Sequence, residues 1–387
     1  MGGIRKYVRP SGGLRGGYTL YELLVAMAIS TILMVIVYTI YIRAARSYRV
    51  QNMAIEQQNR ARFGVEHLRR DIANAGFNGA TNTSQDPNVC FAPNGDIRAL
   101  TLQQSSQSTS LVNPSKNVNI TPLEITLFGD YAGQGEIFYT ASVVGSTITL
   151  QDDGVTFGPN LKVTQEAFEN IFKSDGTRYL RIADAEQYEM LIPITGNNFN
   201  SRTVTVSVAP PQRSGSQACG IQGFGQALQI NSAMYMRYRL TVSNATTGQT
   251  DLVREVLDVN RNVVAGSLLT IAEYVVDLNA YDFVFDVDET KLQPSFVTTP
   301  LPDTSIVDST GSAGQLGTLS ATSQDLRFMT IKLTVRSEDE DPDYKFQPRV
   351  QERLIRSYEV FTDLDGAART FSMTSKIMLQ NLAMRNI

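Results

Sequence analysis

The sequence of 387 residues has few of the side chains that build metal centres and nucleophilic active sites. It holds one histidine, His67, and two cysteines, Cys90 and Cys219. A nucleophile triad that uses a histidine is therefore excluded everywhere except at His67. Two cysteines far apart in sequence and one histidine cannot complete a tetrahedral metal shell. We predict that the protein is not an enzyme and has no cofactor, and we expect His67 to be a solvated helix residue.

Two further binding classes lack their sequence signals. No Gly-x-x-x-x-Gly-Lys-Ser/Thr run is present, which excludes a phosphate-cradling P-loop. The 34 Lys and Arg against 38 Asp and Glu give a net charge of −4. This mildly acidic balance argues against a dedicated nucleic-acid binder, which needs a basic face. We expect no nucleic-acid partner.

An acidic run at residues 338–343 is the best metal candidate. From Asp339 onward, aspartates at alternate positions match the first three ligands of an EF-hand loop. Tyr344 stands where that loop needs glycine, and Val350 stands where it needs a bidentate glutamate. We expect a solvated acidic turn, and a calcium site is the alternative.

What the sequence does contain is a long apolar run near its start. From Leu20 to Ile42 there are 23 residues without proline or glycine, and Glu22 is the only charged one. A helix of that length spans about 35 Å, enough for a hydrocarbon core of about 30 Å. A signal peptide would have a shorter apolar region placed before its cleavage site. Here Gly16 and Gly17 precede the run, so cleavage there leaves a membrane helix on the mature protein.

Flanking charges orient this helix only weakly. Residues 1–17 contain no acid and four cations, Arg5, Lys6, Arg9 and Arg15. The segment after the apolar run contains three cations, Arg43, Arg46 and Arg49. Four against three barely favours a cytoplasmic start by the positive-inside rule. The order of cleavage site and apolar run is the main argument for placing residues 1–17 in the cytoplasm.

Glu22 needs a physical explanation, because a carboxylate at the centre of a membrane helix costs about 2.5–3.5 kcal/mol and less near an end. One interpretation is that Glu22 lies close enough to the headgroups to be hydrated. The other is that it pairs with a cation of a neighbouring subunit. Cleavage after Gly17 would create such a cation, the α-amine of Tyr18. An ion pair in a low dielectric would fix the axial register of packed helices.

These residues resemble the class III signal of type IV prepilins and pseudopilins. In that family a glycine precedes the cut, and the mature helix both anchors the protein and packs into a filament. The matching residues are Gly17, Thr19, Leu20, Glu22 and Leu23, while Tyr18 stands where the family usually has Phe and Tyr21 where it usually has an aliphatic residue. The resemblance implies that a prepilin peptidase cuts between Gly17 and Tyr18 and methylates the Tyr18 amine.

The helical pattern continues beyond the apolar run but becomes one-sided. Apolar residues recur at spacings of three and four, at Ala61, Val65, Leu68, Ile72 and Ala75. Gly76 then provides a stop signal and Asn78-Gly79 a turn. We therefore predict one helix from about Tyr18 to about Ala75, with a membrane-spanning first half and an amphipathic second half.

After residue 77 the pattern becomes mostly strand-like. The expected strands are 123–128, 137–144, 147–150, 203–208, 234–242, 281–287, 328–335 and 372–379, with a hairpin turn at 244–248, a short helix within 163–173 and an ambiguous segment at 269–278. Composition predicts loops at 103–119 and about 293–325, the second one mobile. The predicted fold class is α+β: a long N-terminal helix packed on a large, mostly antiparallel, β-rich, pilin-like head at 77–387, with one lobe or two.

Segments 69–77, 252–287 and 379–386 resemble large minor pilins of the PilW type and the related J-type minor pseudopilins of type II secretion. The expected domains are a leader at 1–17, a pilin helix at 18–76 with its transmembrane segment at about 20–42, and the head. This implies a structural minor pilin of a type IV pilus system, co-assembled in a priming or tip complex. The alternatives are a minor pseudopilin of a type II secretion system, or a membrane-anchored surface-binding protein that does not assemble.

The resemblance also implies partners and a location. The expected partners are prepilin peptidase, other minor and major pilins, an inner-membrane assembly platform and membrane lipid. The expected location is the bacterial inner membrane, with a single pass and the head in the periplasm, and then the pilus at the cell surface. An exported compartment permits a disulfide between Cys90 and Cys219; the alternative is two separate buried thiols.

Overall fold

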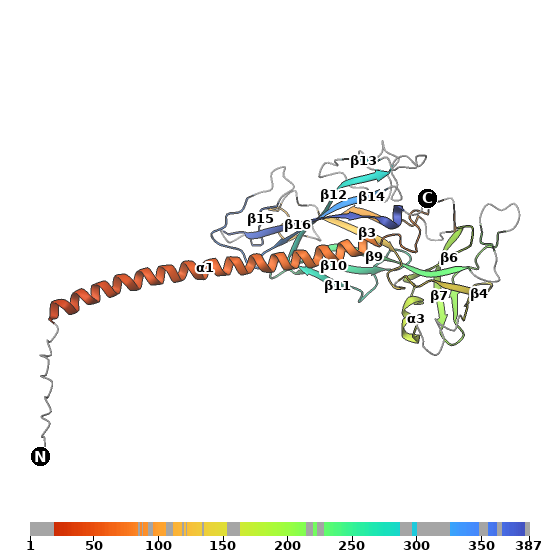
Figure 1. Ribbon diagram of the computed structural model, residues 1–387, viewed down its shortest axis with the longest axis horizontal. Helices are drawn as coiled ribbons and strands as arrows, with labels where there is room; N and C mark the ends of the chain where they lie inside the picture. Colours follow the sequence, from red (N-terminus) through yellow and green to blue (C-terminus); the bar gives the residue numbers. More distant parts are fainter. Residues whose placement is uncertain are drawn as a thin grey trace, which may run out of the picture. The chain divides into compact units, whose positions relative to one another are not determined.

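The computed structural model describes residues 19–83, 86, 88–91, 96–105, 111–117, 120, 122–133, 135–152, 163–213, 220–222, 228–286, 296–299, 326–347, 355–361 and 366–383. The chain divides into two compact units, an N-terminal unit (residues 1–54) and a head unit (residues 55–387). Helix α1 (Leu20–Ala73) begins in the first unit and ends in the second (Figure 1). The long N-terminal helix and the large β-rich head of the sequence prediction are confirmed.

The end of α1 follows its sequence signals. The helix ends at Ala73, two residues before the predicted end. Gly76 adopts a left-handed conformation with φ of +76°, which glycine takes without steric cost. The Gly76 amide donates to the Phe128 carbonyl at 2.8 Å, so the turn after the helix is tied to a strand. Asn78 also has a positive φ of +48°, as a turn residue can.

Eleven strands form the larger sheet of the head unit, in the order β1-β7-β8-β5-β4-β9-β10-β11, with β2, β3 and β6 paired beside this path. The longest strand, β9, pairs with β3, β4, β6 and β10. The strands are β1 (Val89–Phe91), β2 (Leu100–Gln104), β3 (Leu123–Gly129), β4 (Phe138–Val144), β5 (Thr147–Leu150), β6 (Arg178–Ala183), β7 (Glu189–Asn198), β8 (Thr203–Val206), β9 (Gln229–Asn244), β10 (Gln249–Leu257) and β11 (Leu269–Glu273). Helix α3 (Gln165–Ile171) lies between β5 and β6 in sequence.

A second sheet of five strands has the order β13-β12-β14-β16-β15 (Figure 1). Its strands are β12 (Val275–Asp286), β13 (Phe296–Thr299), β14 (Leu326–Arg336), β15 (Ser357–Tyr358) and β16 (Ala368–Met378), followed by helix α4 (Gln380–Ala383). Among the described strands of both sheets, only the β1–β7 pair is parallel. The mostly antiparallel head is therefore as predicted.

The second half of α1 packs into the largest hydrophobic cluster of the head unit, which confirms the predicted stripe. The cluster joins Ala61, Val65, Leu68, Ile72 and Ala75 to Ile125, Leu127, Tyr238, Leu240 and Leu252 of the first sheet and to Leu278, Met329, Ile331, Leu333 and Val335 of the second. A Cβ atom added at Gly64 would lie 2.6 Å from Leu333 Cδ2 and 3.2 Å from the Ala272 Cβ. At Gly64 the helix therefore lies close to both sheets, because it has no side chain there.

A polar cluster around Asp71 ties the last turns of α1 to the first sheet. The buried Asp71 carboxylate accepts from the Tyr238 hydroxyl at 2.5 Å and from Arg254 Nη1 at 3.4 Å, both through Oδ2. The Asp71 carbonyl accepts from the Tyr131 hydroxyl at 2.8 Å. Burial, together with the Asp71 charge, raises the pKa of Tyr238, so its hydroxyl remains a donor. The cluster therefore satisfies a carboxylate that would be costly to bury alone.

Several predicted loops and strands need correction. Residues 296–299 lie within the expected loop at 293–325 but form strand β13. Their sequence, Phe-Val-Thr-Thr, favours a strand and pairs with residues 283–286 of β12. Residues 293–295 and 300–325 lie outside the described residues. Strands β1, β2, β6, β7, β10 and β15 were not predicted, and the end of β2 at Gln104 falls within the loop expected at 103–119. The first six residues of β7 are all buried, so they lack the alternation that identifies a half-buried strand, and Pro193 within it is a further counter-signal.

Candidate functional site

The first turn of α1 is closed by a reciprocal pair of hydrogen bonds between Thr19 and Glu22. Thr19 precedes the helix, and its hydroxyl oxygen accepts from the Glu22 amide at 3.2 Å. In return, Glu22 Oε2 accepts from the Thr19 amide at 2.9 Å and from the Thr19 hydroxyl at 3.0 Å. This arrangement is a capping box, in which a Thr before the helix and a Glu three residues later satisfy each other's backbone amides. It explains why the helix begins at Leu20.

The capping box gives Glu22 a local role that neither sequence interpretation included. Both Thr19 donors reach the same oxygen, Oε2. No residue that the structure describes donates to Glu22 Oε1, so this oxygen can accept a further hydrogen bond or ion pair. The Thr-x-x-Glu spacing just before an apolar run is visible in the sequence and is a known helix-start signature. The pattern could therefore have identified the cap.

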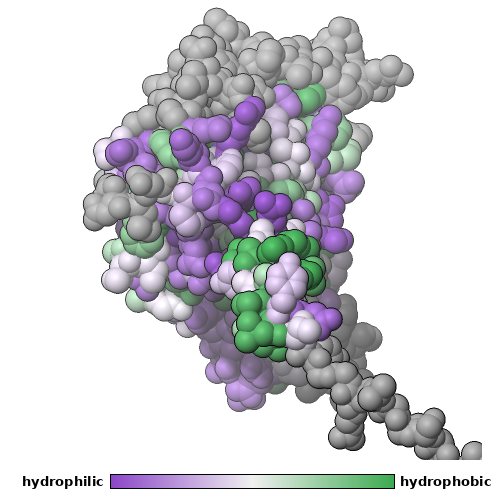
Figure 2. Space-filling view, turned by 90° about the vertical axis from the view of Figure 1, so that its left-hand side faces the viewer, coloured by the Kyte–Doolittle hydropathy of each residue, from purple (hydrophilic) through white to green (hydrophobic). Residues whose placement is uncertain are grey.

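From Thr19 to Arg49, every residue of the N-terminal unit is exposed in the single chain. These residues include large apolar side chains such as Leu20, Met34 and Tyr41, which are 78%, 73% and 70% exposed. Figure 2, viewed from the side where α1 begins, shows hydrophobic residues on the helix surface. By length and composition, α1 can cross a membrane. Soluble proteins rarely leave so large an apolar surface uncovered.

Two threonines within the apolar run satisfy their hydroxyls inside the helix. Thr31 Oγ1 donates to the Met27 carbonyl at 2.8 Å, and Thr39 Oγ1 donates to the Val35 carbonyl at 2.7 Å. Bonds to the carbonyl four residues earlier let a hydroxyl remain in an apolar medium without an external partner. Between Leu20 and Ile42, Glu22 is therefore the residue whose charge must be explained.

Residues 14–38 match the family model of the prokaryotic N-terminal methylation motif. No curated protein and no solved structure matches the chain. The motif supports a protein of the type IV pilin or pseudopilin kind that is processed at its N-terminus by prepilin peptidase and associates with other pilins. It also agrees with anchoring by the apolar helix. The PilW-type subfamily stays a prediction, because the match ends at residue 38.

The remaining predicted site residues are only partly placed. Gly17 and Tyr18, the expected cleavage and methylation positions, lie outside the described residues, and so does Cys219. Cys90 is in β1, and its Sγ accepts from the Gly220 amide at 3.1 Å. Gly220 directly follows Cys219 in sequence, so the pairing of Cys90 with Cys219 stays a prediction.

The acidic run at 338–343 is more strongly engaged than a solvated turn would be. Asp341 Oδ2 accepts from Arg369 Nε and Nη2 at 3.0 and 2.8 Å. Glu340 Oε1 accepts from the Val360 and Phe361 amides at 2.5 and 3.1 Å. Two of the acids thus hold neighbouring segments together. Within the described residues, no group of three or more His, Cys, Asp or Glu side chains is arranged to hold a metal ion.

His67 is half-buried, so the expectation of a solvated residue was wrong. Its ring packs against Phe63 with a centroid distance of 4.5 Å. Its Nδ1 is buried and has no hydrogen-bond partner among the described residues. Burial, reinforced by the Arg70 charge, lowers the pKa of His67. The physical reason is its place at the border of the buried stripe, beside Leu68 and three residues after Gly64.

Proposed function

We propose that the chain is a structural minor pilin of a type IV pilus system, anchored by α1 and co-assembled in a priming or tip complex. The observation that carries the proposal is the capped, exposed and apolar first half of α1, which lies within and beyond the matched methylation motif. Such a helix needs lipid or sibling helices to cover it. The protein's role is therefore assembly, and no enzymatic step is required of it.

The proposed sequence of events begins in the inner membrane. Residues 1–17 stay in the cytoplasm, the apolar part of α1 spans the bilayer, and the head lies in the periplasm. Prepilin peptidase cuts between Gly17 and Tyr18 and methylates the new Tyr18 amine. The capping box survives this cut, because its donors come from Thr19 and Glu22.

After processing, Glu22 takes a second role between subunits. Oε2 remains with Thr19, and Oε1 accepts from the Tyr18 amine of an adjacent subunit. In a low dielectric this ion pair is strong, and helices packed out of register would leave it unmade. Glu22 thereby caps the start of its own helix and fixes the axial register of the adjacent helix.

The size of the head supports a place at the tip. Removing 17 residues from 387 leaves 370, and about 310 of them follow the helix. Heads of that size would crowd one another along a helical shaft, whereas a tip complex needs only one copy. Removing the four leader cations changes the net charge from −4 to −8 for the mature chain.

Mass spectrometry of the mature N-terminus tests the processing step. We expect a chain that begins at Tyr18 and carries one methyl group on its α-amine. A Gly17→Ala variant is expected to keep its leader, whereas Gly16→Ala serves as the neighbouring control and is expected to be cut. A mature chain that begins anywhere else would overturn the processing proposal.

Two variants separate the local and intersubunit roles of Glu22. Glu22→Gln keeps a side chain that can complete a capping box but removes the charge. Thr19→Val removes the capping hydroxyl, at a cost of about 1 kcal/mol to the helix start, and leaves the carboxylate. We expect Glu22→Gln to be processed yet lost from isolated filaments, and Thr19→Val to be retained.

The opposite pattern would mean that Glu22 acts only as a cap. Retention of Glu22→Gln at the wild-type level would remove the ion pair from the proposal. If the wild-type protein itself never co-purifies with other pilins, the non-assembling surface protein is the correct alternative. Deletion separates the two assembly systems, because loss of pili indicates a pilin and loss of protein export with intact pili indicates a pseudopilin.

A further inference from the structure

A small cavity on the first sheet of the head unit is lined by arginines. Its volume is about 100 Å³, and its lining includes Arg98, Thr101, Thr126, Tyr235, Arg237 and Arg261. Thr101 pairs with Thr126 across β2 and β3, and Thr126 pairs with Arg237 across β3 and β9. Side chains of directly paired residues point to the same face of a sheet. The cavity, which we call the arginine pocket, is therefore built on one cross-strand row.

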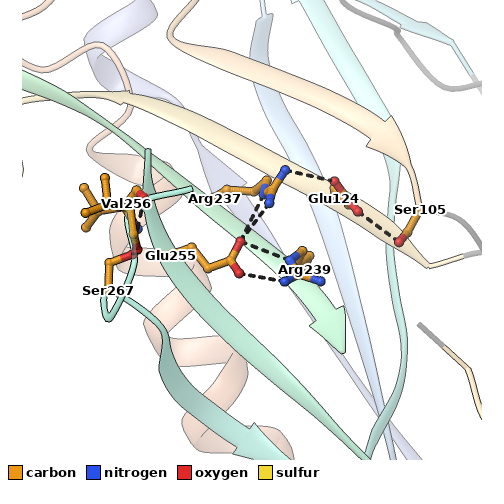
Figure 3. Close-up of polar contacts among 8 residues, drawn as sticks. Ser105, Glu124, Arg237, Arg239, Glu255, Val256 and Ser267 are labelled. Carbon is orange, nitrogen blue, oxygen red and sulfur yellow. Dashed lines mark hydrogen bonds and ion pairs between the residues drawn. The ribbon is translucent and has the colours of Figure 1, made fainter. Parts of the chain in front are cut away.

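Arg237 is held in position by two acids that do not line the pocket. Its Nη2 lies 2.8 Å from Glu255 Oε2, and its Nη1 lies 3.7 Å from Glu124 Oε2. Glu255 also binds Arg239, at 2.7 Å between Nη2 and Oε1. Figure 3 shows Arg237 between the two glutamates, with Arg239 on the other side of Glu255. The guanidinium is thus oriented before any ligand arrives.

The other two arginines come from loops at the ends of strands. Arg98 precedes β2, and its Nε is buried with no hydrogen-bond partner among the described residues. Arg261 has a left-handed φ of +67°, its Nη2 donates to the Asp96 carbonyl, and its Cζ lies 5.7 Å from the centre of the Tyr235 ring. No acidic residue of the described chain is among the lining side chains. Three arginines therefore line the pocket, and of these Arg237 is already ion-paired with Glu255 and Glu124 behind it.

Tyr235 places a buried donor in the same pocket. It is only 3% exposed, and its hydroxyl has no hydrogen-bond partner among the described residues. An unsatisfied buried hydroxyl lowers stability, so it needs an explanation. Burial raises the pKa of Tyr235, which keeps the hydroxyl protonated at neutral pH. The hydroxyl and Arg98 Nε are two buried donors that have no acceptor in the part of the chain that the structure describes.

We infer that the arginine pocket binds an oxyanion, a phosphate or carboxylate group, between Arg98, Arg237 and the Tyr235 hydroxyl. Arginine forks match the planar or tetrahedral oxygens of such groups, and charge-assisted hydrogen bonds are among the strongest in proteins. The chain is acidic overall, so the pocket is a local exception. The inference does not depend on filament assembly and concerns the head alone.

The test is thermal unfolding of the full-length protein in detergent micelles at constant ionic strength. Inorganic phosphate and acetate are titrated separately against chloride, and the two titrations distinguish a phosphate-type from a carboxylate-type ligand. We expect one of them to raise the Tm of the wild type in a saturable way. Arg98→Gln is expected to weaken the apparent Kd by about tenfold or more, the loss of one charge-assisted hydrogen bond.

Two further variants make the result specific. Arg69→Gln removes one positive charge from an exposed position of α1, away from the pocket and from the glutamates that hold Arg237, and is expected to keep the anion effect. Tyr235→Phe is expected to have at least the wild-type Tm without anion and a smaller shift with it. The inference is overturned if neither anion raises the Tm of the wild type, or if the anion-induced rise in Tm is reduced equally in Arg98→Gln and Arg69→Gln.

Discussion

Glu255 is the acid on which two arginines of β9 converge, and its environment gives the head a dependence on pH. Its side chain is 1% exposed, whereas Arg237 and Arg239 are 22% and 23% exposed. Burial alone would raise the pKa of Glu255, but hydrogen bonds from Arg239 and Arg237 outweigh it and lower the pKa. The folded protein therefore gains stability above the unfolded pKa of about 4.3 and loses it as pH falls through the folded value.

We expect the free energy of unfolding of the head to decrease as the pH falls below about 4.3. Urea unfolding of the full-length protein in micelles, measured between neutral and acid pH, checks this. Glu255→Gln should lower stability at neutral pH and flatten the dependence in the acid range. An equally steep acid dependence in Glu255→Gln would show that other carboxylates control it.

Asp71 is the second residue on which a prediction rests. Asp71→Ala leaves the Tyr238 hydroxyl without its acceptor and Arg254 without its ion pair. We expect it to destabilise the head by about 3 kcal/mol in urea unfolding. Asp71→Asn can still accept from Tyr238 and is expected to cost less. Glu66→Ala, at an exposed position of the same helix, is the control and should change stability by less than about 0.5 kcal/mol.

At the scale of elements, the contact between α1 and the sheets depends on Gly64. Gly64→Val would drive a branched side chain into Leu333 and Ala272, since even a Cβ lies 2.6 Å from the nearest atom of Leu333. Overpacking of this kind costs about 1–3 kcal/mol. Gln58→Val places the same residue on an exposed part of the helix and is the matched control. Equal Tm values for the two variants would contradict the close packing.

Helix α1 was predictable because its signals are local and repeated. The stripe from Ala61 to Ala75 needed only the helical period to be recognised, and it is the stripe that packs in the core. The lone charge of Glu22 within an apolar run predicts that the residue is important, whereas its capping role follows from its spacing from Thr19. Strand β7 could not be found by alternation, since burial on both faces removes the alternation.

The arginine pocket could not have been predicted from the sequence. Arg98, Arg237 and Arg261 come from distant parts of the chain, and no motif links them. Only the pairing of β2, β3 and β9 brings the first two to one region. Sites of this kind depend on strand order, which a single sequence does not encode in any local pattern.

At the scale of the whole molecule, the two cysteines offer a covalent link between distant segments. Cys90 Sγ lies 3.1 Å from the amide nitrogen of Gly220, the residue after Cys219. We predict that protein isolated from its native cells without reductant carries a Cys90–Cys219 disulfide, which would stabilise the fold by about 4–5 kcal/mol for so long a loop. Alkylation followed by mass spectrometry checks this: both thiols should stay unmodified until reductant is added. Full alkylation without reductant would exclude the disulfide.

The way the head holds the second half of α1 has a mechanical consequence. Gln57 Nε2 donates to the Arg369 carbonyl at 2.8 Å, Gly64 touches both sheets, and Asp71 binds Tyr238. These three points are spread over about 20 Å of helix. Tension applied along the helix axis therefore loads them together, in shear, along with the whole apolar stripe. If a subunit is pulled by the N-terminal end of α1, these contacts between the helix and the head would have to break together. The helix would not separate from the head one turn at a time.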